Sequence, residues 1–217
     1  MPASTDVISA VHSGDLENLR MILQSDPSLA SARDENGVSA LMHAYYRRQF
    51  AIADLLLQSK LELDIFEATA AGNAAQVAAI LQRNTEAARN WSADGFTALH
   101  FAAFFNRAEI ARMLVRHGAD VAAVARNAMQ VTPLHSAAAA HSAEIVRLLV
   151  ENGAPANSRQ QGGWTALHEA AQIGDREMVK TLIEYGADRS VRSDDGRTPA
   201  QMAQAKGHEE IARMLLP

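Results

Sequence analysis

One four-residue segment recurs through the second half of the chain at an almost constant interval. It begins at Thr97, Thr132, Thr165 and Thr198, and its first three copies read Thr-Ala/Pro-Leu-His. The steps between copies are 35, 33 and 33 residues. This interval is typical of linear repeat proteins, in which each unit cannot bury its apolar face alone and stacks on its neighbours. We therefore expect the 217 residues to form one elongated domain with a core running through the stack.

The apolar pattern within each unit predicts two short helices. In the second copy, the first helix carries Ala137 and Ala138 on its inward face. The second helix places Ile145, Leu148 and Leu149 at positions i, i+3 and i+4. The equivalent residues of the neighbouring units are Ile110, Met113 and Leu114, and Met178, Val179 and Leu182. We expect Leu148 to bridge two layers of the stack, so that replacing it with alanine is strongly destabilising.

Glycine marks the ends of these helices and the turns that follow. Each second helix ends at a Gly-Ala pair, at Gly118, Gly153 and Gly186. Glycine accepts the left-handed backbone conformation that closes a helix. Turn pairs such as those at 94–95 and 195–196 read Asp-Gly, which favours a tight hairpin. Each unit is therefore predicted to be two antiparallel helices followed by a projecting hairpin, which we call a finger.

The full pattern, Gly-x-Thr-Ala/Pro-Leu-His-x-Ala-Ala followed by Leu-Leu-x-x-Gly-Ala-Asp, resembles the ankyrin repeat family. The match is close from Asp94 to Leu216 and degenerate in the first ninety residues. The resemblance implies an all-α fold: an ankyrin-repeat solenoid of stacked helix-turn-helix units with projecting β-hairpin loops.

The degenerate first half shows an order of its own. Residues 6–57 align with residues 64–115 at an offset of 58, which indicates a duplicated pair of units. The link 58–63 is too short for a finger, so one hairpin is predicted to be missing there. Residues 124–131 carry a two-residue insertion that predicts one longer finger. We expect a single domain over residues 3–217 with seven units starting near 5, 39, 63, 97, 132, 165 and 198, the first and last acting as caps.

Composition argues against several classes of function. The net charge of −5 provides no basic surface for nucleic acid or for an anionic membrane. The absence of cysteine excludes disulfides and thiolate metal sites and fits a reducing, cytoplasmic compartment. No apolar run approaches the roughly 20 residues that span a bilayer. Only three of the 20 basic residues are lysine, a bias often seen in GC-rich bacterial genes.

The histidines are the residues most easily mistaken for a reaction centre. His100, His135 and His168 recur one unit apart, so they are not expected to converge on one point. The family resemblance implies that they are hydrogen-bonded inside the turn that opens each first helix. The other histidines, His12 and His43 among them, are expected to be isolated. No catalytic residue, cofactor or metal site is therefore predicted.

Nine of the eleven aromatic residues lie between residues 45 and 105, and aromatic side chains carry much of the energy of protein recognition. In the ankyrin-like frame, the ends of the first helices and the fingers line a concave groove. At least one of the adjacent Phe104 and Phe105 must then face solvent. The candidate partner-binding residues are Tyr46, Arg47, Phe96, Phe104, Phe105, Val131, Trp164 and Arg197.

The leading hypothesis is a non-enzymatic, monomeric protein-interaction module with an unknown protein partner. Two alternatives stay open for the aromatic residues, because they could be groove anchors or bulky filler of irregular units. The family resemblance also leaves scaffolds, inhibitors, adaptors and secreted bacterial effectors open.

Two other functions remain as alternatives. One is a purely structural or self-associating array, in which a second copy occupies the groove. The other is an enzyme or small-ligand protein with a site between residues 50 and 91, where Glu62, Asp64 and Glu67 would have to converge in a closed pocket. The spacing of Asp64 and Glu67 also predicts a helix capping box.

Overall fold

The computed structural model describes residues 3–60 and 62–216, and over these residues it contains fourteen α-helices, three short 3₁₀ helices and no β-strand. The all-α class predicted from the sequence is confirmed. Leu61 in the predicted short link and Pro217 at the predicted domain end lie outside the described residues. The α-helices are α1 (Ser4–Ser13), α2 (Leu16–Ser25), α3 (Ala40–Tyr46), α4 (Phe50–Ser59), α5 (Ile65–Ala71), α6 (Ala74–Arg83), α7 (Ala98–Phe104), α8 (Ala108–Arg116), α9 (Pro133–Ala139), α10 (Ala143–Glu151), α11 (Ala166–Ile173), α12 (Arg176–Glu184), α13 (Pro199–Ala205) and α14 (Glu209–Met214). The 3₁₀ helices are η1 (Pro27–Ser31), η2 (Thr85–Arg89) and η3 (Gln161–Gly163).

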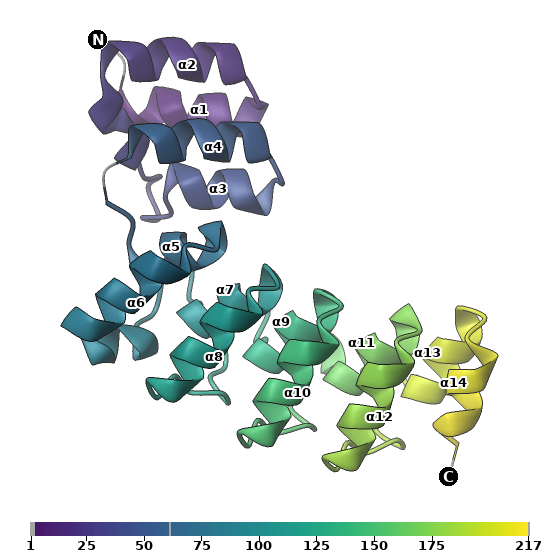
Figure 1. The fold of residues 1–217 in the computed structure, drawn as a ribbon. Helices are drawn as coiled ribbons and strands as arrows, with labels where there is room; N and C mark the ends of the chain where they lie inside the picture. The colour runs from purple at the N-terminus through teal and green to yellow at the C-terminus, as the bar shows by residue number, and fades with distance from the viewer. Residues whose placement is uncertain (1–2, 61, 217) are drawn as a thin grey trace.

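Consecutive helices form antiparallel pairs, and the pairs stack side by side along the molecule (Figure 1). The first helix of each pair contacts the first helix of the next, from α1 through α13. Buried alanines such as Ala102 and Ala137 line these contacts, because a small side chain lets two helix backbones approach closely. Leucine, isoleucine and valine on the second helices complete each layer of the core.

The internal duplication is confirmed by the order of the elements. The 3₁₀ helices η1 and η2 start 58 residues apart, as do α3 and α7. The fingers at 33–39 and 91–97 are each closed by an isolated antiparallel bridge, Arg33 with Ser39 and Trp91 with Thr97, again 58 residues apart. The same sequence spacing has therefore produced the same local structure twice.

The missing finger after α4 changes the course of the stack. Between α4 and α5 the described residues 60 and 62–64 form no hairpin, and the helix axes turn between the α3/α4 pair and the α5/α6 pair (Figure 1). The fingers of the first and third helix pairs then meet. A Cβ added at Gly37 would lie only 3.2 Å from the Cβ of Ala93. The fingers that follow in sequence are present, and the one between α8 and α9 is lengthened by the predicted insertion.

Leu148 packs against the core, as expected, but it is less deeply buried than its neighbours in α10. Leu148 is only partly buried, whereas Ile145, Val146 and Leu149 are fully buried. Helix α10 packs against α8 and α12 as well as against α9, so its buried face is centred away from Leu148. A pattern of i, i+3 and i+4 describes a helix with one packed side and misses this second set of contacts.

We expect Leu149→Ala to lower the free energy of unfolding by about 2 kcal/mol more than Leu148→Ala, because only Leu149 is fully enclosed. Urea unfolding of the two variants measures this difference. Equal losses in the two variants would contradict the packing described for α10.

Candidate functional site

The three repeated histidines connect neighbouring units. His100 Nδ1 accepts the backbone N–H of Thr97 at 3.2 Å and lies 2.8 Å from the Thr97 hydroxyl. Because Nδ1 is an acceptor, Nε2 carries the proton, and it donates to the carbonyl of Val131 in the next finger at 3.1 Å. The equivalent Nε2 bonds join His135 to Ser158 and His168 to Arg197. The expected hydrogen bonds within the turn are confirmed, and each imidazole also ties its unit to the following finger.

Burial keeps these imidazoles neutral. It lowers the pKa of His100 to about 4, and it lowers the pKa of His135 and His168 as well. Each ring uses both of its nitrogens in structural hydrogen bonds. They therefore stabilise the stack and have no free nitrogen to offer to a ligand.

The expectation that His12 and His43 are isolated was wrong. Their Nε2 and Nδ1 atoms lie 3.4 Å apart, and His43 Nε2 donates to the carboxylate of Asp34 at 2.9 Å. The stacking of α1 on α3 brings together residues that are 31 positions apart in sequence. Within residues 3–60 and 62–216, no group of three or more metal-ligating side chains converges.

A groove of about 420 Å³ runs between the first helices and the fingers around α7 and α9. We call it the aromatic groove. Buried Phe101 and Val131 form part of its floor, while Tyr46 and Phe104 lie on its helix side. The complete lining is Tyr46, Asp94, Phe96, His100, Phe101, Phe104, Met129, Val131, His135, Ser136, Ala139 and Gln160.

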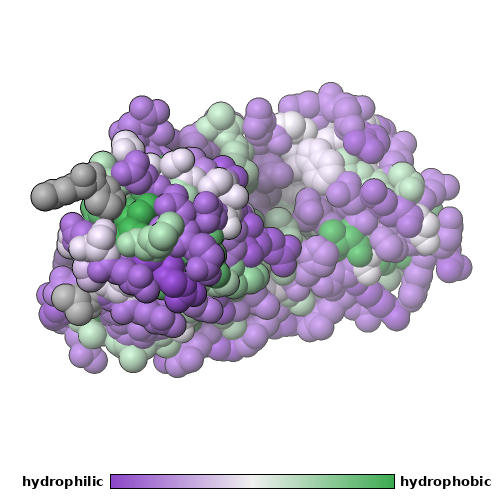
Figure 2. All heavy atoms as spheres, turned by 90° about the horizontal axis from the view of Figure 1, so that it is seen from above, coloured by the Kyte–Doolittle hydropathy of each residue, from purple (hydrophilic) through white to green (hydrophobic). Residues whose placement is uncertain are grey.

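Four predicted site residues line the aromatic groove: Tyr46, Phe96, Phe104 and Val131. The exposed fraction is 50% for Phe104 and 37% for Tyr46, whereas Val131 is buried. Phe104 occupies the last turn of α7, where its side chain projects from the stack while Ala103 points inward. Figure 2 shows hydrophilic residues over most of one face of the molecule, with apolar residues in small separate areas.

The other four predicted residues lie outside the groove lining. Arg47 is exposed at the C-cap of α3, and Trp164 is half-buried beside His168. Arg197 is exposed and forms an ion pair with Asp195. Phe105 is half-buried and packs against the ring of Tyr45, with 5.6 Å between the centroids. Phe105 therefore fills space beside the core, as the alternative interpretation expected for some of these aromatics.

Sequence reasoning missed Asp94, Met129 and Gln160, which the fingers contribute to the groove. Met129 is 52% exposed and lies in the finger with the two-residue insertion. The backbone N–H of Gln161 donates to the carbonyl of Met129 at 3.0 Å, so the lengthened finger is fastened to the next one. For Met129 the insertion was the available signal, because extra residues in one finger bring new side chains over the groove.

A hydrogen bond joins Tyr46 and Asp94, which both line the aromatic groove. The Tyr46 hydroxyl donates to Asp94 Oδ2, and the Ser92 hydroxyl donates to Asp94 Oδ1 at 2.6 Å. Burial, together with the adjacent Asp94 carboxylate, raises the pKa of Tyr46 far above its ordinary value. The phenol therefore stays neutral and remains a hydrogen-bond donor at any physiological pH.

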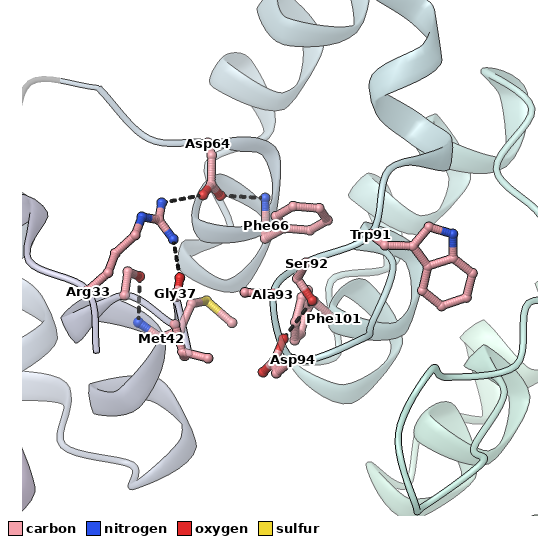
Figure 3. Close-up of a pocket in the computed structure, with 12 residues that line it drawn as sticks. Arg33, Gly37, Met42, Asp64, Phe66, Trp91, Ser92, Ala93, Asp94 and Phe101 are labelled. Carbon is pink, nitrogen blue, oxygen red and sulfur yellow. Dashed lines mark hydrogen bonds and ion pairs between the residues drawn. The ribbon is translucent and has the colours of Figure 1, made fainter. Parts of the chain in front are cut away.

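The region between residues 50 and 91 does not gather the three carboxylates of the alternative enzyme hypothesis. Glu62 is exposed, while Asp64 and Glu67 form the predicted capping box of α5. Arg33 pairs with Asp64 at 2.9 Å, and Lys60 pairs with Glu67. Figure 3 shows the small pocket beside them, about 90 Å³, between Arg33 and the finger at 91–97. These carboxylates hold the turn of the stack together.

The stacked helix pairs, their fingers and the concave aromatic groove define a repeat solenoid, a class of protein that presents an extended surface. A family model described as ankyrin repeats in three copies matches residues 65–160 and 134–217. The chain belongs to the ankyrin repeat family. Ankyrin repeat proteins are generally protein-interaction modules and are typically non-enzymatic. None of the described helices has the length and apolar character that crossing a bilayer requires.

Proposed function

We propose that this protein is a monomeric interaction module that binds a protein partner through the aromatic groove and the neighbouring finger tips. The observation that carries the proposal is the exposure of Phe104 and Met129, at 50% and 52%, on the two sides of one apolar groove. Large apolar side chains at this exposure cost little stability to replace and gain binding energy when a partner covers them.

The domain proposed for this function spans residues 3–217 and has seven helix pairs as units, with the first and last as caps. The terminal helices support the role of caps. In α14, Glu209 and Glu210 are exposed, and in α1 only one side carries buried residues. A polar outer face is what terminal units of a stack require for solubility.

The test is selection of peptide ligands from a random-peptide display library, followed by affinity measurements with matched variants. We expect Phe104→Ala to weaken the selected ligands by about tenfold or more, because truncating a central aromatic anchor costs about 2 kcal/mol in binding. The unfolding free energy should change by less than about 1 kcal/mol, since half of this side chain is already exposed.

Phe50→Ala is the matched control. Phe50 is 57% exposed on α4 and does not line the groove. Its replacement should leave ligand affinity unchanged. Ligands that bind Phe104→Ala and the unaltered chain equally would show that recognition happens elsewhere, and the proposed site would then be wrong.

A further inference from the structure

Asp94 differs from three other aspartates at the finger turns, Asp34, Asp194 and Asp195, because each of these has a basic partner. Asp34 pairs with His43, Asp194 with Arg159, and Asp195 with Arg197. Asp94 receives two hydroxyl hydrogen bonds, and no ion pair to it occurs within residues 3–60 and 62–216. It is therefore a half-buried carboxylate at the edge of an apolar groove, and no described basic side chain lies within ion-pair distance of it.

The two hydroxyl donors leave acceptor capacity on this carboxylate. An ionised carboxylate offers about four lone-pair positions, and Tyr46 and Ser92 use one on each oxygen. Partial removal from water without a counter-charge costs free energy, which a cation entering the groove would recover. The conditions that favour binding of a positive charge are thus present at this end of the groove.

The neighbouring side chains suit the rest of a basic residue. Tyr46 and Phe104 present exposed ring surface, and aromatic faces attract ammonium and guanidinium groups. The apolar lining accommodates the methylene stem of lysine or arginine. The net charge of −5 attracts basic partners over longer distances.

We propose that the aromatic groove selects a partner segment in which a basic side chain pairs with Asp94 and an adjacent apolar side chain packs between Phe104 and Met129. This inference rests on the proposed function and adds the chemistry of the partner. Acidic and purely apolar segments would be bound more weakly.

Three small probes that share a phenyl ring and differ in the polar end test this selectivity. They are phenylbutylamine, a cation, phenylbutanol, which is neutral, and phenylbutyrate, an anion. Each is titrated into the full isotope-labelled chain at neutral pH and low salt, and amide chemical shifts report the site and the affinity. We expect shifts at groove residues, with the amine binding about threefold to fivefold more tightly than the alcohol and the acid binding most weakly.

Asp94→Asn removes the charge and keeps an oxygen that can accept the Tyr46 hydroxyl. In this variant we expect the amine to lose its advantage while the alcohol binds as before. Asp194→Asn, at an exposed finger carboxylate that Arg159 already neutralises, is the matched control and should preserve the advantage of the amine.

Equal binding of amine and alcohol, an advantage that survives Asp94→Asn, or the absence of groove shifts with all three probes would each overturn the inference. The proposed function fails on a different result, namely selected peptides whose affinity does not depend on Phe104. The two failures are therefore distinguishable.

Discussion

Lowering the pH from about 6.5 to about 4 should reduce the free energy of unfolding by several kcal/mol. In this range the buried histidines bind protons in the unfolded chain but stay neutral in the folded chain. Burial lowers the pKa of His100 from 6.5 to about 4. Between these values the imidazole is protonated only when the chain is unfolded, so stability is complete above pH 6.5 and is lost as the pH falls. His100 alone contributes about 3 kcal/mol. His135 and His168 act in the same direction.

The chain itself supplies a control for this effect. Gln201 occupies the position equivalent to the histidines, and its Oε1 accepts the backbone N–H of Thr198 at 2.9 Å. Glutamine does not titrate but offers one acceptor and one donor, as the neutral imidazole does. The triple variant His100→Gln, His135→Gln, His168→Gln should therefore lose most of the acid dependence between pH 6.5 and 4.

Urea unfolding at a series of pH values measures both chains. The carboxyl groups with lowered pKa, those of Asp34, Asp188 and Asp195, affect stability mainly below about pH 4, so their effect is separated from that of the histidines. The same slope in the unaltered chain and in the triple variant would refute the role assigned to the histidines.

Glu67→Ala should cost about 3–5 kcal/mol of unfolding free energy, since it leaves the Lys60 ammonium buried without its partner. The side chains of Lys60 and Glu67 are 5% and 1% exposed, and Nζ lies 2.5 Å from Oε1. Glu67 Oε2 also accepts the backbone N–H of Asp64 at 3.1 Å, so the same carboxylate caps α5. The loss thus combines an unpaired charge with an unsatisfied helix end.

The double variant Lys60→Met, Glu67→Met distinguishes these contributions. Replacing both charges with apolar groups of similar volume removes the buried ammonium, so this variant should be clearly more stable than Glu67→Ala. Thermal unfolding of both variants measures the difference. A loss below about 1 kcal/mol in Glu67→Ala would show that the pair is open to water.

The repeat interval, the duplication and the missing finger could all be predicted, because each is a matter of spacing along the chain. The 58-residue offset returns in η1 and η2 and in two equivalent bridges. The exposure of one residue of the Phe104 and Phe105 pair follows from helix geometry alone.

The contacts between units could not be predicted in the same way. Tyr46 meets Asp94 across 48 residues, and His12 meets His43 across 31, because of the stacking and the turn after α4. A repeat alignment places each residue within its own unit. It does not give the angle at which one helix pair packs against the next, and that angle decides which residues of different units meet. The partial exposure of Leu148 has the same origin, because it depends on how α10 lies between α8 and α12.

The close approach of Gly37 to Ala93 places the first finger, 33–39, beside the finger that carries Asp94. Gly37 and Ala93 line the small pocket that adjoins the aromatic groove at Asp94 and Phe101, so the first finger lies beyond this end of the groove. We expect a bound peptide that extends past Asp94 to meet this finger and to change direction there. We therefore expect the groove to select partner peptides by shape as well as by composition. It should accept terminal or strongly bent segments more readily than the middle of a straight, continuous one.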